Sequence, residues 1–85
     1  MTRLLEAPAP VQVELAAGIP ARVSLGGGRR EVERVCARWR VEGDWWRAPV
    51  SREYWKLVLG GGGSLLCDLY RDQLTGEWWL SRLYD

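Results

Sequence analysis

Aromatic side chains in adjacent pairs are the residues of this chain best suited to molecular recognition. The pairs are Trp45-Trp46, Tyr54-Trp55 and Trp78-Trp79. All six tryptophans fall within residues 39–79. In a β-strand, neighbouring side chains point to opposite faces, so each pair in a strand sends one ring inward and one outward. The inward rings can build a core, whereas the outward rings must be covered by another part of the chain, by a second copy or by a binding partner.

Arginines near these rings add a second kind of recognition chemistry. Eleven of the twelve cationic residues are arginine, and four lie close in sequence to an aromatic pair or tyrosine: Arg47, Arg52, Arg71 and Arg82. Arginine stacks on indole faces and binds phosphates with two hydrogen bonds. Rings interleaved with arginines on a β-surface are also typical of proteins that bind single-stranded nucleic acid. The alternative is cross-strand ion pairing with Glu53, Asp68, Asp72 and Glu77, and the net charge of only +1 favours it.

Catalytic and metal-binding residues are scarce. The chain has no histidine, which excludes His-dependent nucleophilic triads and imidazole acid–base chemistry. Two isolated cysteines without histidine cannot make a structural zinc site. The glycine run 60–63 lacks the Lys-Ser/Thr and helix start of a phosphate-binding loop. We therefore expect no enzyme activity, no catalytic residues, no metal site and no cofactor.

The bulk composition is that of a globular domain. Eighty-five residues, 47% of them hydrophobic and 27% charged, are enough for one core but not for two. No signal peptide and no transmembrane stretch are recognised, so we expect a cytoplasmic protein in a reducing compartment. There, Cys36 and Cys67 are expected to be small buried apolar residues, with a disulfide between them as the alternative.

Alternation of apolar and polar residues predicts strands along nearly the whole chain. Residues 1–10 contain two prolines and no period, which predicts a loose N-terminal arm before a single β domain of residues 11–85. Residues 11–15 and 21–25 alternate clearly. The segment 31–41 favours a strand with a bulge near Glu33-Arg34 over a helix. The sequence Glu42-Gly43-Asp44 is expected to form the next turn.

The second half of the chain predicts three more strands. One begins at residues 45–47, is interrupted at Pro49 and resumes over residues 52–59, because proline cannot donate to a ladder. Residues 65–71 and 77–84 form the last two, joined by an Asp72–Gly76 turn with a glycine bulge. The predicted fold class is all-β, with five or six antiparallel strands in a meander that forms a small barrel or a strongly twisted sheet.

The last three strands are apolar on both faces, although an exposed antiparallel sheet normally has one polar face. The second face could be covered by the N-terminal strands, by a homodimer or by a different partner. In the core we expect Trp39, one of Trp45 and Trp46, either Trp55 or Tyr54, and one of Trp78 and Trp79. A single bulge would exchange the inner and outer members of a pair.

The tryptophan-rich part of the chain resembles a family of small uncharacterised bacterial domains. The resemblance is carried by residues 39–47 (WRVEGDWWR), 52–55 (REYW), 68–72 (DLYRD) and 76–85 (GEWWLSRLYD), and covers residues 18–85. This pattern is similar to the C-terminal region of the polymerase-like accessory protein of mutagenic translesion synthesis. The resemblance implies a non-catalytic module linked to bacterial DNA repair. It transfers no functional residues, and the catalytic polymerase motifs are absent.

Two functions remain open from the sequence. The first is a non-catalytic interaction module that contacts a protein partner or forms a homodimer through an aromatic β-surface. Its partner-binding candidates are Trp46, Trp55, Trp79, Tyr70, Arg47 and Arg52. The second is single-stranded nucleic-acid binding by aromatic stacking and arginines, for which Arg29 and Arg30 are additional candidates. No membrane partner is expected.

Overall fold

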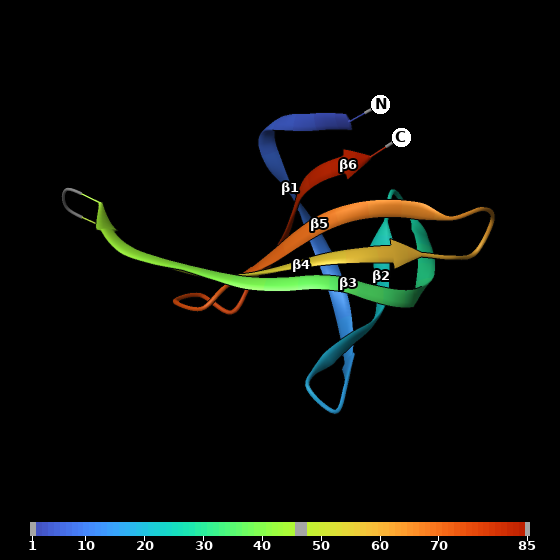
Figure 1. Ribbon diagram of the computed structural model, residues 1–85, viewed down its shortest axis with the longest axis horizontal. Helices are drawn as coiled ribbons and strands as arrows, with labels where there is room; N and C mark the ends of the chain where they lie inside the picture. The colour runs from blue at the N-terminus through green and yellow to red at the C-terminus, as the bar shows by residue number, and fades with distance from the viewer. Residues whose placement is uncertain (1, 46–47, 85) are drawn as a thin grey trace.

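Six antiparallel strands close into a small barrel, which confirms the predicted fold class (Figure 1). The computed structural model describes the backbone of residues 2–45 and 48–84 and the side chains of residues 8–43 and 49–84. The strands are β1 (Thr2–Ala16), β2 (Ile19–Leu25), β3 (Gly28–Trp45), β4 (Ala48–Leu59), β5 (Leu65–Asp72) and β6 (Trp78–Tyr84). Each strand pairs with its neighbour in sequence, and β1 pairs with β6 to close the barrel.

The two long strands, β1 and β3, make closure possible because each pairs with a different neighbour along each part of its length. The first part of β1 pairs with β6 and its last part pairs with β2. Similarly, β3 pairs with β2 only from Gly28 to Glu31 and with β4 from Val32 onward. A short chain can therefore enclose a core with six strands.

The prediction of a loose arm over residues 1–10 is wrong, because Thr2–Ala16 forms one strand. Pro10 pairs with Trp79 and Ala9 with Leu80, and the β1–β6 register shifts between Leu4 and Ala9. A strand with such an irregularity does not need a regular alternation of apolar and polar residues, which explains why the sequence shows no period of two here. It also accommodates Pro8, since a proline fits a strand best where the regular ladder is broken.

A long β3–β4 ribbon extends beyond the barrel body (Figure 1). The predicted bulge in β3 is confirmed by a register shift between Val32 and Arg34, and a second shift lies between Val35 and Ala37. The predicted turn at residues 42–44 is wrong, because Gly43 pairs with Val50 and Asp44 with Pro49. The strand that was expected to start at Trp45 starts at Ala48 instead. The pairing of β4 with β5 begins only at Arg52, so Pro49 lies in a part of β4 that has no β5 partner. This agrees with the expected position of a proline at a sheet edge.

Tight turns fix the register of the first two hairpins. Ala17 and Gly18 have φ values of 53° and 79°, and Gly26 and Gly27 have values of 55° and 84°. Two successive positive φ angles are the geometry of the turn that best matches strand twist in a two-residue hairpin. At the last hairpin, Gly76 donates its N–H to the Asp72 carbonyl at 2.7 Å and has a φ of 80°, as the sequence pattern indicated.

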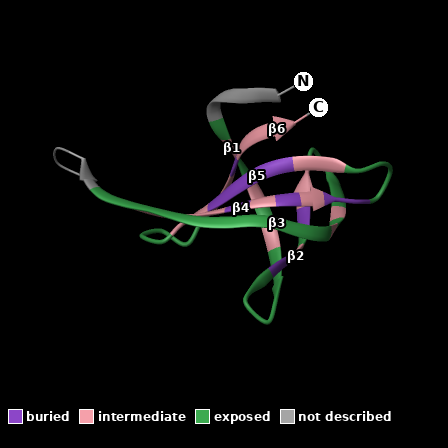
Figure 2. Cartoon of the chain, viewed as in Figure 1, coloured by how far each residue is buried: buried purple, intermediate pink, exposed green. Residues whose placement is uncertain are grey.

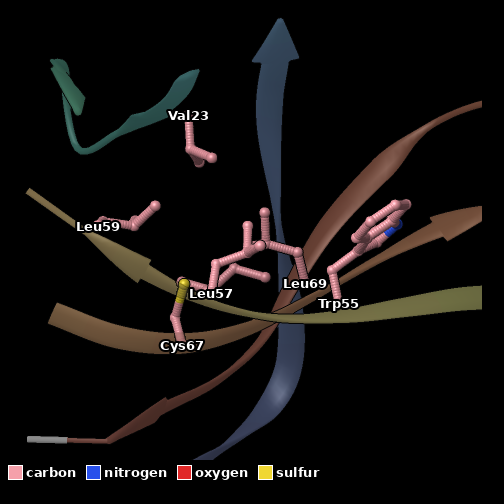
Figure 3. Packing of buried hydrophobic residues seen from close by; sticks show 7 residues of the cluster. Val23, Trp55, Leu57, Leu59, Cys67 and Leu69 are labelled. Carbon is pink, nitrogen blue, oxygen red and sulfur yellow. The ribbon is translucent and has the colours of Figure 1, made fainter. Parts of the chain in front are cut away.

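The core lies between β2, β4, β5 and β6. Its buried members are Val23, Trp55, Leu57, Leu59, Cys67, Leu69 and Leu80. Alternate positions of β4 and β5 point inward and meet across the ladder, as Leu57 does with Cys67. Figure 3 shows Trp55 at one end of this cluster, and Val23 and Leu59 at the other. Within the described residues, no helix has the length and hydrophobicity needed to cross a bilayer.

Three expectations about burial need revision. Trp39 was expected in the core, but its side chain is 38% exposed. Trp78 and Trp79 are both half-buried, and only Trp78 packs against the core cluster. Cys36 is exposed, whereas Cys67 is buried as expected; both are free thiols. The expectation for Trp45 and Trp46 concerns side chains outside the described residues.

Candidate interaction surface

The outer face of the sheet carries a line of four rings on four neighbouring strands. In register across β3, β4, β5 and β6, Trp39 pairs with Tyr54, Tyr54 with Tyr70, and Tyr70 with Trp79. Directly opposed residues of antiparallel strands point to the same face. We call these four residues the aromatic row. Strand alternation places it opposite the core, because the neighbours Trp55 and Leu69 point inward.

Three rings of the row, those of Trp39, Tyr54 and Tyr70, contact one another. Trp39 and Tyr54 are stacked, with centroids 5.3 Å apart and planes at 6°. The centroids of Tyr54 and Tyr70 are 5.1 Å apart, with planes tilted by 40°. Tyr70 is only 5% exposed, whereas Tyr54 and Trp79 are half-buried. The row is therefore packed at its centre and accessible at its ends, with Trp39 as its most open member.

Arg52 covers the centre of the row. Its guanidinium carbon lies 4.6 Å from the Tyr70 ring centroid, and its Nη1 donates to the Tyr54 hydroxyl at 3.4 Å. That hydrogen bond is the largest cause of the raised pKa of Arg52. Burial raises the pKa of Tyr70, and the nearby Arg52 charge opposes that shift. At neutral pH Arg52 is therefore positively charged and Tyr70 is uncharged, so the centre of the row carries one fixed positive charge.

A second cluster lies beside the row on the same face. The Lys56 ammonium nitrogen is 4.8 Å from the Tyr84 ring centroid, and the Arg82 guanidinium carbon is 6.0 Å from it. The Tyr84 hydroxyl donates to Asp68 Oδ2 at 2.7 Å. Asp68 is 5% exposed, and its Oδ1 has no hydrogen-bond partner among the described residues. The tyrosine thus links a buried carboxylate to two cations near its ring.

Cross-strand ion pairing does not explain the arginines near the rings. Arg52, Arg71 and Arg82 lie over Tyr70, Trp78 and Tyr84 respectively. Within the described side chains, none of the three makes an ion pair of 4 Å or less, so that expectation is wrong for them. Ion pairs occur instead on the other face of the β3–β4 ribbon, where Arg38 and Arg40 meet Glu53 at 2.9 and 3.7 Å.

The sequence candidates divide between several places. Trp79, Tyr70 and Arg52 come together at the aromatic row. Trp55 does not, because it is 2% exposed and lies in the core with Arg38 4.5 Å above its ring. Its prediction as a surface residue is therefore wrong. Trp46 and Arg47 fall outside the described residues.

The two nucleic-acid candidates lie at the other end of β3 from the row. Arg29 is 3.5 Å from Glu14, and Arg30 donates to the Gly60 and Gly63 carbonyls at 3.4 and 3.3 Å. Arg30 thereby fastens the β4–β5 loop to β3. These arginines are used within the chain, and neither extends the aromatic row.

Sequence reasoning missed two members of the row, Trp39 and Tyr54. The alternation in β4 could have identified Tyr54. Trp55 lies two and four residues before Leu57 and Leu59 and therefore points inward with them, so its neighbour Tyr54 must point outward. No comparable signal identifies Trp39. The shift between Val32 and Arg34 reverses the facing and places Val35 on the same side as Leu57, and the shift between Val35 and Ala37 reverses it again, so that Trp39 lies on the opposite face.

Comparisons with known proteins provide no relative. No family model, no curated protein and no solved structure matches the chain significantly. Among the described residues, no group of three or more His, Cys, Asp and Glu side chains is arranged to hold a metal ion. The candidate site is therefore a partly exposed aromatic surface with cations over its rings.

Proposed function

We propose that this protein is a non-catalytic interaction module that binds a protein partner through the aromatic row and Arg52. The observation that carries the proposal is the alignment of Trp39, Tyr54, Tyr70 and Trp79 on the face opposite the core. Aromatic residues and arginine are enriched in the buried centres of protein interfaces. Rings already held by their neighbours also lose little side-chain freedom on binding.

The contacts within the row favour a protein over a nucleic acid. Base stacking needs free ring faces, but Trp39 and Tyr54 stack on each other and Arg52 lies over Tyr70. A protein surface can instead pack against ring edges and accept hydrogen bonds from Arg52. The resemblance to the tryptophan-rich bacterial domains directs the search first to proteins of bacterial DNA repair in the cytoplasm.

Photo-cross-linking at the row tests this proposal in the full chain. Benzoylphenylalanine in place of Trp79 puts the reactive group on β6, and the same substitution at Leu74 provides the matched control. Leu74 is 59% exposed in the β5–β6 connection and is not a member of the aromatic row. We expect a distinct polypeptide to be captured from cells of the source organism at position 79 and not at position 74.

The captured polypeptide is then purified and titrated with wild-type protein and with Trp79→Ala. Loss of this accessible aromatic contact is expected to weaken binding by about 2 kcal/mol, or roughly thirtyfold. Equal affinity of the two proteins, or equal capture at positions 74 and 79, would count against the proposal.

Single-stranded nucleic-acid binding is the second candidate. It is favoured by Arg52, Lys56 and Arg82, which lie over rings on one face and make no ion pair among the described side chains. The readout is tryptophan fluorescence during titration with oligonucleotides at low salt. Quenching that disappears in Arg52→Ala and weakens steeply with salt would favour this function over protein binding.

A further inference from the structure

The β3 strand has a long unpaired edge. It pairs with β2 only from Gly28 to Glu31, and beyond Val32 its one recorded partner within the described backbone is β4. The other edge of β3 therefore presents free N–H and C=O groups along the extended ribbon in Figure 1. Such an edge is a template on which another strand can pair.

This edge is also exposed along its described length. Every residue from 33 to 43 is exposed, and the segment is green throughout Figure 2. Three large apolar side chains lie in it: Val35, Trp39 and Val41, at 38%, 38% and 43% exposure. Proteins commonly protect a free edge with bulges, prolines or charged side chains. Here both bulges precede Ala37, and the pairing with β4 is regular from Ala37 to Trp45, with no proline in β3.

The charges along the regular part of the edge are complementary to themselves. In an antiparallel pair of identical strands related by a two-fold axis, one residue faces its own copy and the others pair symmetrically around it. Such an axis can be placed at different residues of β3. A two-fold axis at any one of residues 36–40 puts an arginine of one copy opposite an arginine of the other, and the arginines concerned are Arg34, Arg38 and Arg40. Like charges in directly opposed positions destabilise a strand pair.

An axis at Val41 avoids every arginine–arginine pair. It places Arg40 of each copy opposite Glu42 of the other, so that two opposite-charge pairs form. It also places Trp39 opposite Gly43, where no side chain competes for the space above the sheet. Within one chain, Arg40 and Glu42 are 3.3 Å apart with both side chains more than half exposed, so they can exchange partners at little cost.

We propose that two copies of this chain form a symmetric dimer by antiparallel pairing of their β3 edges, centred on Val41. A two-fold axis perpendicular to the sheet keeps the same faces together, so the two aromatic rows lie on one side of a continuous sheet. The pairing uses the strand edge rather than the aromatic row. It therefore stands independently of the proposed function.

Sedimentation equilibrium of the full chain over a range of concentrations tests the dimer. Wild-type protein is expected to show a monomer–dimer equilibrium. The Glu42→Arg variant brings arginine opposite arginine in both of the symmetric pairs, and the Arg40→Glu variant brings glutamate opposite glutamate in both. Each variant alone is expected to raise the dimer dissociation constant roughly tenfold or more.

The mixture of the two variants provides the sharpest result. One chain then carries two arginines and the other two glutamates at these positions, so a heterodimer is expected to form with at least wild-type affinity. Recovery in the mixture also shows that each variant is folded. Glu77→Arg, an equal charge change at an exposed residue of the β5–β6 connection, is the matched control and is expected to dimerise normally.

Three outcomes would overturn the dimer: monomeric wild-type protein at every concentration, wild-type dimerisation in Glu42→Arg, or no heterodimer in the mixture. Trp79→Ala separates this proposal from the proposed function, because Trp79 lies on β6, three strands from the free edge. We expect that variant to dimerise as the wild type does while losing the contact of the aromatic row with its protein partner.

Discussion

The indole of Trp39 lies parallel to the ring of Tyr54, with 5.3 Å between the centroids and 6° between the planes. This contact joins β3 to β4 where the ribbon leaves the barrel body, and it begins a line of rings that continues to β6. Under the proposed function, its position on the face opposite the core gives it a role in recognition as well as in the ribbon. Consequences for stability, pH dependence and binding can be measured separately.

The Trp39–Tyr54 stack is expected to stabilise the ribbon cooperatively. In a double-mutant cycle with Trp39→Ala and Tyr54→Ala, the coupling free energy should be about 0.5–1.5 kcal/mol, because aromatic pairs contribute this much beyond their buried area. Urea unfolding of the four proteins gives the value. Strictly additive losses would show that the two rings act independently.

Replacing the inner and the outer tryptophan should have unequal effects. Trp55→Ala removes a core ring that is 2% exposed and is expected to cost about 3–5 kcal/mol of unfolding free energy. Trp79→Ala removes a half-buried ring on the opposite face and should cost about 1 kcal/mol. Urea denaturation compares the two variants, which differ only in position. Similar losses would contradict the assignment of inner and outer faces.

The hydrogen bond between Tyr84 and Asp68 is expected to support the barrel. Tyr84→Phe leaves the nearly buried carboxylate of Asp68 without its 2.7 Å donor, which should cost about 1–3 kcal/mol. Tyr54→Phe removes a hydroxyl whose bond to Arg52 is longer, at 3.4 Å, and should cost under about 0.5 kcal/mol. Thermal unfolding of both variants provides the comparison, and a smaller loss in Tyr84→Phe than in Tyr54→Phe would refute it.

Alkaline pH is expected to weaken the fold through Cys67. Burial raises the pKa of this thiol from 9.0 to about 12. Above pH 9 the unfolded chain loses the proton while the folded chain keeps it, so stability is full below pH 9 and falls as the pH rises towards 12. The expected slope approaches about 1.4 kcal/mol per pH unit.

Urea unfolding between about pH 8 and pH 10 measures this slope before tyrosines contribute strongly. Cys67→Ala should flatten it, whereas Cys36→Ala, which removes only the exposed thiol, should retain it. A steep slope that persists in Cys67→Ala would assign the effect to another group.

Much of the fold is predictable because local patterns and tertiary structure agree. The strands at residues 11–15 and 21–25, the Asp72–Gly76 turn and the bulge near Glu33 appear as the sequence indicates. The alternation in the first of these strands ends at Glu14, where the β1–β2 register shifts and leaves Leu15 43% exposed. The errors occur where tertiary pairing overrides a local signal. Residues 42–44 look like a turn, yet cross-strand pairing with Pro49, Val50 and Ser51 keeps them extended. Pairing with β6 likewise makes a strand of residues 2–10 despite their two prolines.

The candidate site was harder to predict because its geometry depends on register. The sequence identified Tyr70, Trp79 and Arg52, which carry signals of composition and alternation. It misplaced Trp39, whose facing depends on two bulges in the same strand, and assigned Trp55 to the surface although Leu57 and Leu59 share its parity. Which arginines pair with acids and which lie over rings also depends on side-chain distances across strands, which a single sequence does not contain.

Indole N–H signals in a nitrogen-15 spectrum of the full chain follow the aromatic row during binding. On titration with the polypeptide captured at position 79, the Trp79 indole signal should shift or broaden while that of the buried Trp55 stays in place. Trp79 is the informative residue, since Trp39 lies on the β3 edge and would also respond to dimer formation. Binding of that polypeptide with an unchanged Trp79 signal would contradict the assignment of the row as the recognition surface.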